Sequence, residues 1–433
     1  TIFVKEVKNS ANTTRLIPFE FNVAQTYILE FGNNYIRFYR DGGIIVDNSS
    51  NIVETTTTYT SSQLADIKFV QSADVMYLVH PEHPVRKLTR TSHINWILSE
   101  VNFKNGPMMD TNITQTTMRA STRTGNPYVY ASDVVGINSD EGFKSTDIGR
   151  LIKLHDGYTK ITSIPSSTLQ TGINDSTTSL NIASTTGFQT NTPGGYFKMG
   201  DEIIQYQNIS GNTVQSLTRG ALGTTASSHN AGATITSLTS VYTTVQENEE
   251  YRTELMPYIA NTKISAREGD PSSTGLEHND RYVNSEKNFV TEGFKTGMSI
   301  EVAGFSNSSN NATVGNSSYP PKLIVQATED TLLLAPSDTL NVENAGNAVN
   351  MQGALEDDEN WSLGAFSQTT GYPRAIAFYE ERLVLAGTSS NPQTLFFSKG
   401  GDFENFATGT NTDDALIYTI GSNQVNVIRY LSS

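Results

Sequence analysis

The fold is decided by a short stretch near the C-terminal end, which reads Ile376-Ala377-Phe378-Tyr379-Glu380-Glu381-Arg382-Leu383-Val384-Leu385-Ala386-Gly387. Two apolar runs flank a polar turn in it, and the stretch can be laid over residues 67–80 as strand, turn and strand. Both stretches continue through a proline-containing loop, with Pro81 and Pro84 in the first and Pro392 in the second. A further strand is expected after each loop, over residues 85–90 and 393–398. The sequence therefore predicts a strand pattern that recurs.

A similar pattern of strands and turns begins near the N-terminal end, where residues 15–47 alternate between apolar and polar side chains. We expect four strands there, over residues 15–21, 26–31, 35–40 and 44–47. Gly32-Asn33-Asn34 and Asp41-Gly42-Gly43 lie between them, and such pairs of Gly, Asn and Asp favour tight hairpin turns. A second run of about four strands is expected over residues 66–71, 75–80, 85–90 and 93–101. Both runs predict antiparallel meanders.

These observations predict an all-β protein with a β-propeller-like body of four-stranded antiparallel units, because such units resemble propeller blades. An ordinary β-sandwich with similar hairpins is the alternative. We expect residues 1–157 to form the first part of the body and residues 351–433 to continue it, truncated at the end. Residues 158–350 are richer in Ser, Thr, Asn and Gly, and are interpreted as an insertion. Two small β modules are expected within the insertion, over about residues 174–237 and 288–341.

Composition supports strands and loops rather than helices. Ser, Thr and Asn make up about three in ten of the 433 residues, and these side chains compete for backbone hydrogen bonds in helices. The 19 Tyr, 19 Phe and 2 Trp can still anchor several cores. No apolar run reaches the length of a membrane-spanning helix, and no heptad pattern is sustained. One helix is a candidate, over residues 247–259, with a solvated linker as its equal alternative.

The charge excludes some functions. The net charge is −15, from 29 basic and 44 acidic residues, so the chain is not expected to wrap DNA by neutralising phosphates. It could still line a passage through which DNA slides. The absence of cysteine removes disulfides, thiolate metal sites and cysteine nucleophiles. The chain starts at Thr1 and stops just after a strand-like run, so we expect it to be an internal portion of a longer polypeptide.

No motif with chemistry stands out. His80 and His83 lie three residues apart, but the prolines around them predict a loop, which suits a metal site poorly. The loop from Arg219 to Thr225 lacks the lysine of a phosphate loop. Clusters of carboxylates and basic residues occur as well, and are listed here as Asp357-Asp358-Glu359, Glu380-Glu381, Asp413-Asp414, Glu247 with Glu249-Glu250, Arg37-Phe38-Tyr39-Arg40 and Arg86-Lys87-Leu88-Thr89-Arg90. Strand alternation explains the basic clusters. We therefore expect no enzyme and no catalytic, cofactor-binding or metal-binding residues.

Several stretches taken together resemble one family of virion proteins. They are Arg15-Leu16-Ile17-Pro18-Phe19-Glu20-Phe21, Tyr27-Ile28-Leu29-Glu30-Phe31-Gly32, Phe69-Val70-Gln71-Ser72-Ala73-Asp74, Lys87-Leu88-Thr89-Arg90, Gly371-Tyr372-Pro373-Arg374-Ala375 and Ser398-Lys399-Gly400-Gly401-Asp402-Phe403. In combination they resemble the tail nozzle proteins, also called tail tubular proteins B, of short-tailed, podovirus-type bacteriophages. The resemblance covers roughly residues 1–157 and 362–433. The module with Gly200-Asp201-Glu202 and Arg219-Gly220-Ala221 is similar to small β domains of other phage tail proteins.

The resemblance implies a structural virion protein of the phage tail, assembled in the host cytoplasm. It implies a homohexamer docked below the tail adaptor protein, with genomic DNA passing through its lumen without specific binding. Tail fibres and, at infection, the host cell envelope are further expected partners. Relative to the family, an N-terminal lead-in and a long downstream part are missing, so we expect the distal gate outside these residues. The inserted modules are expected to project sideways.

Two other functions remain open at this point. One is a carbohydrate-binding or carbohydrate-degrading tail component that contacts the host surface, and the other is a bacterial adhesin built of β modules. The family implies no catalytic residues, so the positions expected to matter are structural. We expect Gly32, Gly42 and Gly43 to form turns, and Trp96 and Tyr77 to be core aromatics. Leu16, Phe19 and Phe21 cannot all face inward on one straight strand, so Pro18 is expected to break or bulge that strand.

Overall fold

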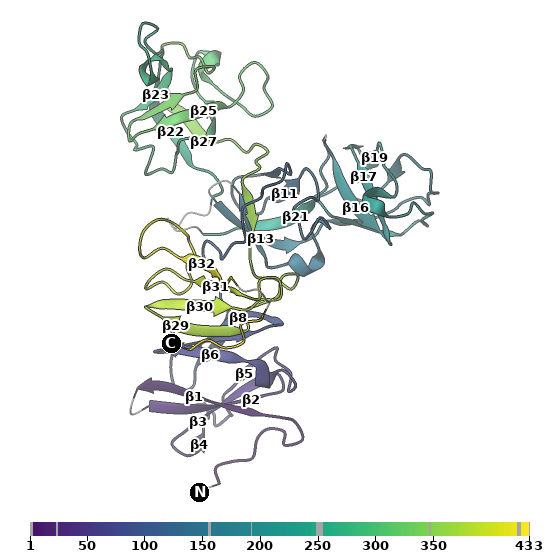
Figure 1. Cartoon of the computed structure of the whole chain (residues 1–433), viewed down its shortest axis with the longest axis vertical. Coiled ribbons are helices and arrows are strands. Elements are labelled where there is room, and N and C mark those ends of the chain that lie inside the picture. The colour runs from purple at the N-terminus through teal and green to yellow at the C-terminus, as the bar shows by residue number, and fades with distance from the viewer. Residues whose placement is uncertain are drawn as a thin grey trace. The chain divides into compact units, whose positions relative to one another are not determined.

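The computed structural model describes residues 3–22, 25–154, 157–191, 193–247, 254–345, 348–421 and 426–432 (Figure 1). Strands account for 43% and helices for 4% of the residues, which confirms the all-β class. The helical elements of the described residues are short 3-10 turns: η1 (Leu64–Asp66), η2 (Ser145–Asp147), η3 (Ala221–Gly223), η4 (Leu276–His278) and η5 (Ser308–Asn310). Of the predicted helix over residues 247–259, residues 248–253 lie outside the described ranges. Its end at Tyr258 belongs to a strand, so the helix is wrong there.

The chain divides into two compact units. The first comprises Thr1–Met109, Thr146–Leu151 and Leu363–Ser433, and the second comprises Asp110–Ser145 and Ile152–Ser362. The first unit thus joins the two ends of the chain. The body expected from the sequence includes more residues than this unit, namely 1–157 and 351–433, and that domain division stays a prediction.

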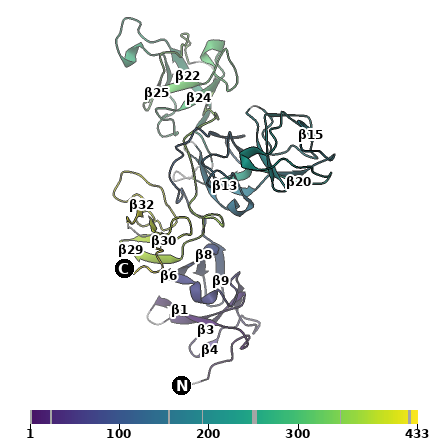
Figure 2. The ribbon, with the colours of Figure 1, turned by 45° about the vertical axis from the view of Figure 1, so that its right-hand side comes forward.

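The first unit contains three antiparallel sheets (Figures 1 and 2). The first sheet consists of β1 (Arg15–Asn22), β2 (Gln25–Gly32), β3 (Tyr35–Arg40), β4 (Gly43–Ile44) and β5 (Glu54–Thr56). The central sheet consists of β6 (Lys68–Ser72), β7 (Val75–His80), β8 (His83–Arg90) and β9 (Trp96–Glu100). The third sheet consists of β29 (Ala375–Tyr379), β30 (Arg382–Ala386), β31 (Thr394–Phe397) and β32 (Leu416–Thr419). Consecutive strands pair within the central and third sheets, so both are meanders of four.

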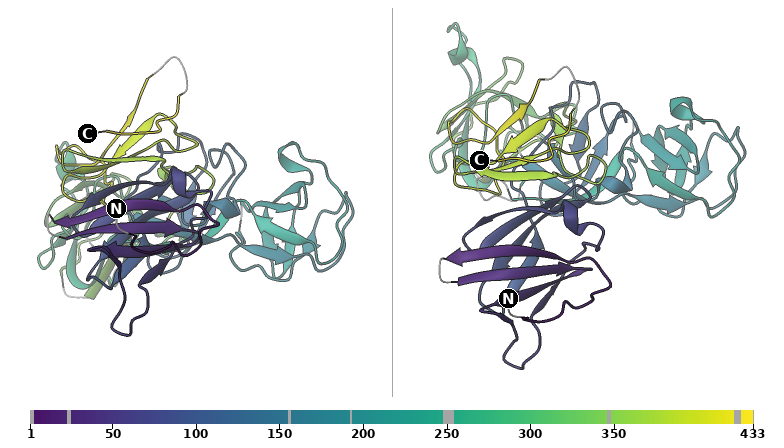
Figure 3. Two further views of the ribbon diagram at one scale, coloured as in Figure 1. Left: turned by 90° about the horizontal axis from the view of Figure 1, so that it is seen from below. Right: turned by 60° about the horizontal axis from the view of Figure 1, so that its bottom comes forward.

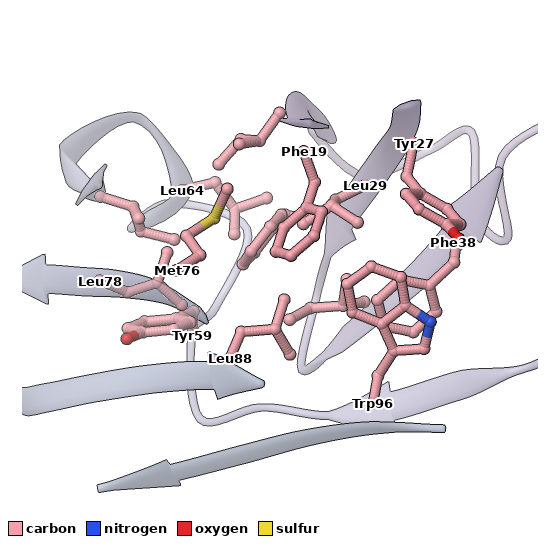
Figure 4. Close-up of a cluster of buried hydrophobic side chains, with 14 residues drawn as sticks. Phe19, Tyr27, Leu29, Phe38, Tyr59, Leu64, Met76, Leu78, Leu88 and Trp96 are labelled. Carbon is pink, nitrogen blue, oxygen red and sulfur yellow. The ribbon is translucent and has the colours of Figure 1, made fainter. Parts of the chain in front are cut away.

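The central sheet is buried on both of its faces. Successive side chains of a strand point to opposite faces, and β7 is apolar at nearly every position. Met76 and Leu78 belong to one core, shared with the first sheet and drawn in Figure 4. Tyr77 and Val79 belong to a second core, shared with the third sheet. The central sheet therefore lies between the other two, and a shift of β7 by one residue would exchange its two sets of core side chains.

Trp96 anchors the core between the first and central sheets. Its indole stacks on Phe38, with ring centroids 4.3 Å apart and planes at 16°. Phe19 and Tyr27 meet the same indole edge-on, at 4.9 and 5.2 Å. Such aromatic contacts add to the area they bury. Arg15 ties the two sheets further, because its guanidinium donates to backbone carbonyls just before the central sheet, at 2.7 Å to Leu64 and 2.6 Å to Ile67.

The core between the central and third sheets combines aromatic rings with one carboxylate. Tyr77 of β7 lies edge-on to Phe378 at 6.3 Å and to Phe403 at 6.4 Å. Its hydroxyl donates to Glu404 at 3.1 Å, and the ammonium of Lys87 donates to the same carboxylate at 2.6 Å. A loop of the third sheet is therefore fastened to the central sheet by an ion pair and a phenol.

The structure places the two matched stretches in corresponding hairpins. Ser72 pairs with Val75 across the β6–β7 turn, and Tyr379 pairs with Arg382 across the β29–β30 turn. The predicted turns are formed, and Trp96 and Tyr77 are both buried. Gly42 has a φ of +74°, which favours glycine, and a Cβ on Gly32 would lie 2.2 Å from the ring of Tyr35, so a larger residue would displace that ring. Gly43 begins β4. Whether these units belong to a propeller stays a prediction.

The expected break at Pro18 is wrong. Pro18 pairs in register with Ile28, and the irregularity of β1 lies further on, between Glu20 and Asn22. β1 is the edge strand of the first sheet, where the missing N–H of proline costs no ladder bond. Leu16, Phe19 and Phe21 do not all face inward, because Leu16 faces outward with 62% of its surface exposed. The outer face of the first sheet therefore carries two exposed apolar side chains, Leu16 of β1 and Ile28 of β2. Figure 3 draws the strands of this sheet in two further views.

The second unit contains further sheets and a closed barrel. A six-stranded sheet has the order β10 (Met118–Ala120), β11 (Tyr128–Ala131), β21 (Ser240–Val245), β13 (Gly157–Ser163), β12 (Leu151–Leu154), β28 (Trp361–Leu363). A module over residues 166–237 contains two sheets. The four-stranded sheet has the order β14 (Ser166–Thr168), β20 (Thr234–Ser237), β16 (Gly195–Met199), β17 (Glu202–Tyr206). The three-stranded sheet has the order β15 (Leu180–Asn181), β19 (Thr213–Gln215), β18 (Asn208–Ser210). The barrel consists of β22 (Tyr258–Arg267), β23 (Arg281–Asn284), β26 (Thr331–Leu334), β25 (Lys322–Ala327), β24 (Ser299–Ala303) and β27 (Ala348–Gly353). Closure leaves the barrel without a free strand edge.

Double burial of the central sheet gives a test by core truncation. We expect Leu78→Ala to lower the free energy of unfolding by about 2–5 kcal/mol, because it leaves a cavity against the first sheet. Val79→Ala, on the opposite face, should cost about 1.5 kcal/mol from lost burial alone. Urea unfolding measures both. Ile97→Ala on β9, where the side chain is 51% exposed, is the control and should cost less than about 1 kcal/mol. A loss confined to one of the two core variants would contradict a sheet buried on both faces.

Candidate interaction surfaces

The two basic clusters are paired with carboxylates. The second cluster lies on β8 of the central sheet, where no residue is exposed, so the expected wet strand face is wrong for it. In the first cluster, Arg37 lies 2.9 Å from Glu54. In the second, each basic residue has an acidic partner: Arg86 with Glu100 at 3.3 Å, Lys87 with Glu404 at 2.6 Å and Arg90 with Asp74 at 3.2 Å. Their positive charge is therefore largely neutralised within the first unit. Neither cluster presents a row of cations that is free to bind the phosphates of a nucleic acid.

His80 and His83 lie on strands rather than in a loop, so that expectation is wrong. His80 ends β7, His83 begins β8, and the two residues face each other across the hairpin. The backbone N–H of Glu82 donates to Nδ1 of His80 at 3.1 Å, so the proton of the neutral ring sits on Nε2. A metal on Nε2 would require the proton on Nδ1, opposite that N–H. Desolvation lowers the pKa of both histidines, which keeps them neutral.

The other candidate groups are dispersed. His155 and Glu249-Glu250 lie outside the described residues. Asp357 lies 4.0 Å from Arg119, and Asp414 lies 3.4 Å from Lys399, so two of the acidic clusters each contact a cation of their own. Within the described ranges, no group of three or more His, Cys, Asp or Glu could hold a metal ion. The carboxylate clusters quoted from the sequence therefore stay separate surface features.

A buried carboxylate, quoted from the sequence only as part of a longer stretch, organises the module over residues 166–237. Glu202 of β17 is 1% exposed, and the guanidinium of Arg219 donates two hydrogen bonds to its carboxylate, of 2.7 and 2.8 Å. Backbone N–H groups of Gly220 and Ser227 donate to it as well, at 3.1 and 3.2 Å. Burial opposes ionisation, but these hydrogen bonds outweigh it and lower the pKa of Glu202 to about 2. The loop compared with a phosphate loop is therefore held by a carboxylate.

Ser227, His229 and Glu202 resemble a catalytic triad in composition only. Nε2 of His229 lies 2.7 Å from Glu202 and 3.2 Å from the hydroxyl of Ser227. In a triad the two partners bind opposite nitrogens of the ring, so that the base can take the serine proton while the acid orients it. Here both contacts use the same nitrogen. The cluster therefore serves to fix the loop.

The outer face of the first sheet carries a pocket of about 370 Å³, which we call the sheet pocket. Its apolar walls include Val4, Leu16 and Ile28, which are 44%, 62% and 42% exposed. Its polar side includes Tyr39 and Glu30. Glu30 is fully buried and accepts hydrogen bonds from the hydroxyls of Tyr35 and Tyr39 and from the backbone N–H of Lys8. Burial, helped by the bond to Glu30, raises the pKa of both phenols and keeps them protonated.

The third sheet ends in an apolar strand that is exposed along its whole length. Leu416, Ile417 and Tyr418 of β32 are 43%, 42% and 60% exposed, and Ile420 directly after it is 42% exposed. β32 pairs with β31 along one edge, and the described residues place no strand along its other edge. Natural edge strands are usually guarded by charges, prolines or bulges. Residues 415–428 contain no charged side chain and no proline, so this edge has no such guard.

Comparison with known proteins leaves the family open. No protein-family model matches the chain, and no curated protein matches it significantly. Among the described residues, no helix is long and apolar enough to cross a membrane. The resemblance to tail nozzle proteins therefore stays a prediction from the sequence.

The Glu202 cluster predicts a pH dependence of the module. Since the pKa of Glu202 lies near 2 in the folded state, against 4.5 for a free side chain, its contribution is complete above about pH 4.5. It is lost as the pH falls from there towards 2, and amounts to about 3 kcal/mol. Hydrogen exchange over residues 195–206 should report this loss. Glu202→Gln should weaken protection at pH 6 and have little further effect at pH 2.5. Asp201→Asn, next to it on the exposed turn, is the control, and an equal response of both variants would contradict the assignment.

Proposed function

We propose that this protein is a structural subunit of the tail nozzle of a short-tailed bacteriophage. In this proposal six copies form a ring below the tail adaptor protein, and genomic DNA leaves the virion through the ring. The resemblance of the quoted stretches to nozzle proteins motivates the proposal. The observation that carries it is the stack of antiparallel sheets in the first unit, with a four-stranded meander buried on both faces.

Sheets that pack face to face in succession are the construction principle of a β-propeller, in which each blade is covered by its neighbours. The central sheet has the strand number, pairing order and double burial of such a blade, and the third sheet repeats its strand pattern. We therefore propose that the first unit is part of a propeller-like body. We propose that the small β domains of the second unit serve contacts with neighbouring subunits, tail fibres or the host cell envelope.

The electrostatics suit a passage for DNA. Six copies with a net charge of −15 each would carry about −90, which repels a polyanion from the wall. The basic residues of the first unit that alternate along its strands are held by carboxylates, and so offer DNA few free cations. DNA can then move without binding, as ejection requires.

Electron microscopy of the intact protein tests the proposal. We expect sixfold rings with a central channel and lateral lobes, alone or after mixing with the adaptor ring. Single-chain particles that refuse to assemble with the adaptor would overturn the nozzle assignment. Trimers or fibres without a through-channel would overturn it in favour of a carbohydrate-binding tail component, and titration with host surface glycans would then test that alternative.

A further inference from the structure

The first unit exposes two apolar patches, and they lie on different sheets. One is the sheet pocket on the outer face of the first sheet, and the other is β32 of the third sheet. Isolated apolar side chains are common on protein surfaces, whereas a contiguous patch indicates an interaction site. β32 combines a patch with an unguarded strand edge, which would favour aggregation if nothing covered it.

The chemistry of the sheet pocket suits an amphipathic ring. Val4, Leu16 and Ile28 offer apolar contact along its walls. On its polar side, Tyr39 donates its proton to the carboxylate of Glu30, so its oxygen remains free to accept a hydrogen bond from a ligand. A tyrosine has an apolar body and a hydroxyl at its tip, and it buries best where both are satisfied.

β32 presents such a side chain. Tyr418 is the most exposed hydrophobic residue of the strand, at 60%, and Leu416 points to the same side because it lies two residues away. The strand is uncharged, so covering it desolvates no ion. Tyrosine is also among the residues that contribute most to binding at interfaces.

One chain cannot join its own two patches. The first sheet packs its inner face on the central sheet, and the third sheet packs on the opposite face of that same sheet. The sheet pocket lies on the outer face of the first sheet, so the central sheet separates it from the third sheet. The occupant that matches in chemistry must therefore come from another molecule.

We propose that Tyr418 and Leu416 of one copy dock into the sheet pocket of a second copy. This contact joins two different surfaces, so each copy keeps one free donor strand and one free pocket. Such a head-to-tail contact propagates from copy to copy and ends only when it closes into a ring. The inference rests on the proposed ring and assigns the residues that hold neighbouring subunits together.

Cross-linking tests this contact cleanly, because the chain contains no cysteine. We would make two variants of the intact protein, Leu16→Cys and Tyr418→Cys, and treat them separately and mixed with a short cross-linker of thiol groups. Both positions are mainly exposed, so the substitutions should leave the fold intact. We expect a covalent dimer in the mixture and none in either variant alone. Tyr418→Ser, without cross-linking, should weaken self-association by at least about tenfold.

The matched control is Ile97→Cys, which is 51% exposed on β9 and lies outside the sheet pocket. Mixed with Tyr418→Cys, it should give no covalent dimer. A dimer from Leu16→Cys alone or Tyr418→Cys alone would indicate like-to-like contacts and overturn the head-to-tail contact. So would a mixture without dimers under conditions where electron microscopy shows rings, although the nozzle proposal would then stand. Rings missing under all conditions would instead defeat the nozzle proposal itself.

Discussion

The burial of β7 on both faces is the constraint on which the first unit depends. Met76 and Leu78 face the first sheet while Tyr77 and Val79 face the third, so one short strand supplies side chains to two cores. Neither core could form if the strand slipped by one residue, because every side chain would change faces. Residues from the two ends of the chain are thereby held in one compact unit, although more than 200 residues separate them in sequence.

Charged side chains around these cores mainly link separate segments of the chain through hydrogen bonds and ion pairs. Arg15 and Arg382 donate to backbone carbonyls at the ends of turns, and Arg382 alone reaches three of them at 2.7 Å. Glu404 joins the central and third sheets, and Glu202 holds a loop of the second unit. In each case the ionised group holds two segments of the chain together.

The hairpins of the first unit could be predicted because their signals are local. Alternating apolar residues and turn residues such as Asp41-Gly42 determine each pair of strands. The closure of the barrel and the hydrogen bonds from Arg219 to Glu202 could not be predicted, because they join residues far apart without a periodic signal. His80 and His83 were misplaced because the prolines beside them were interpreted as a loop, whereas β8 includes Pro84. The sheet pocket depends on Leu16 facing outward, which only the register of β1 decides.

Hydrogen exchange of the intact protein, resolved along the chain, tests most directly whether the central sheet holds the first unit together. We expect the amides of β7 to be the slowest of the first unit and to exchange only when the whole unit unfolds. The amides of β32, which have an open edge and exposed side chains, should exchange much faster. If β7 exchanged as fast as β32, the two cores would not depend on a shared strand, and the account of a stacked, propeller-like body would be contradicted.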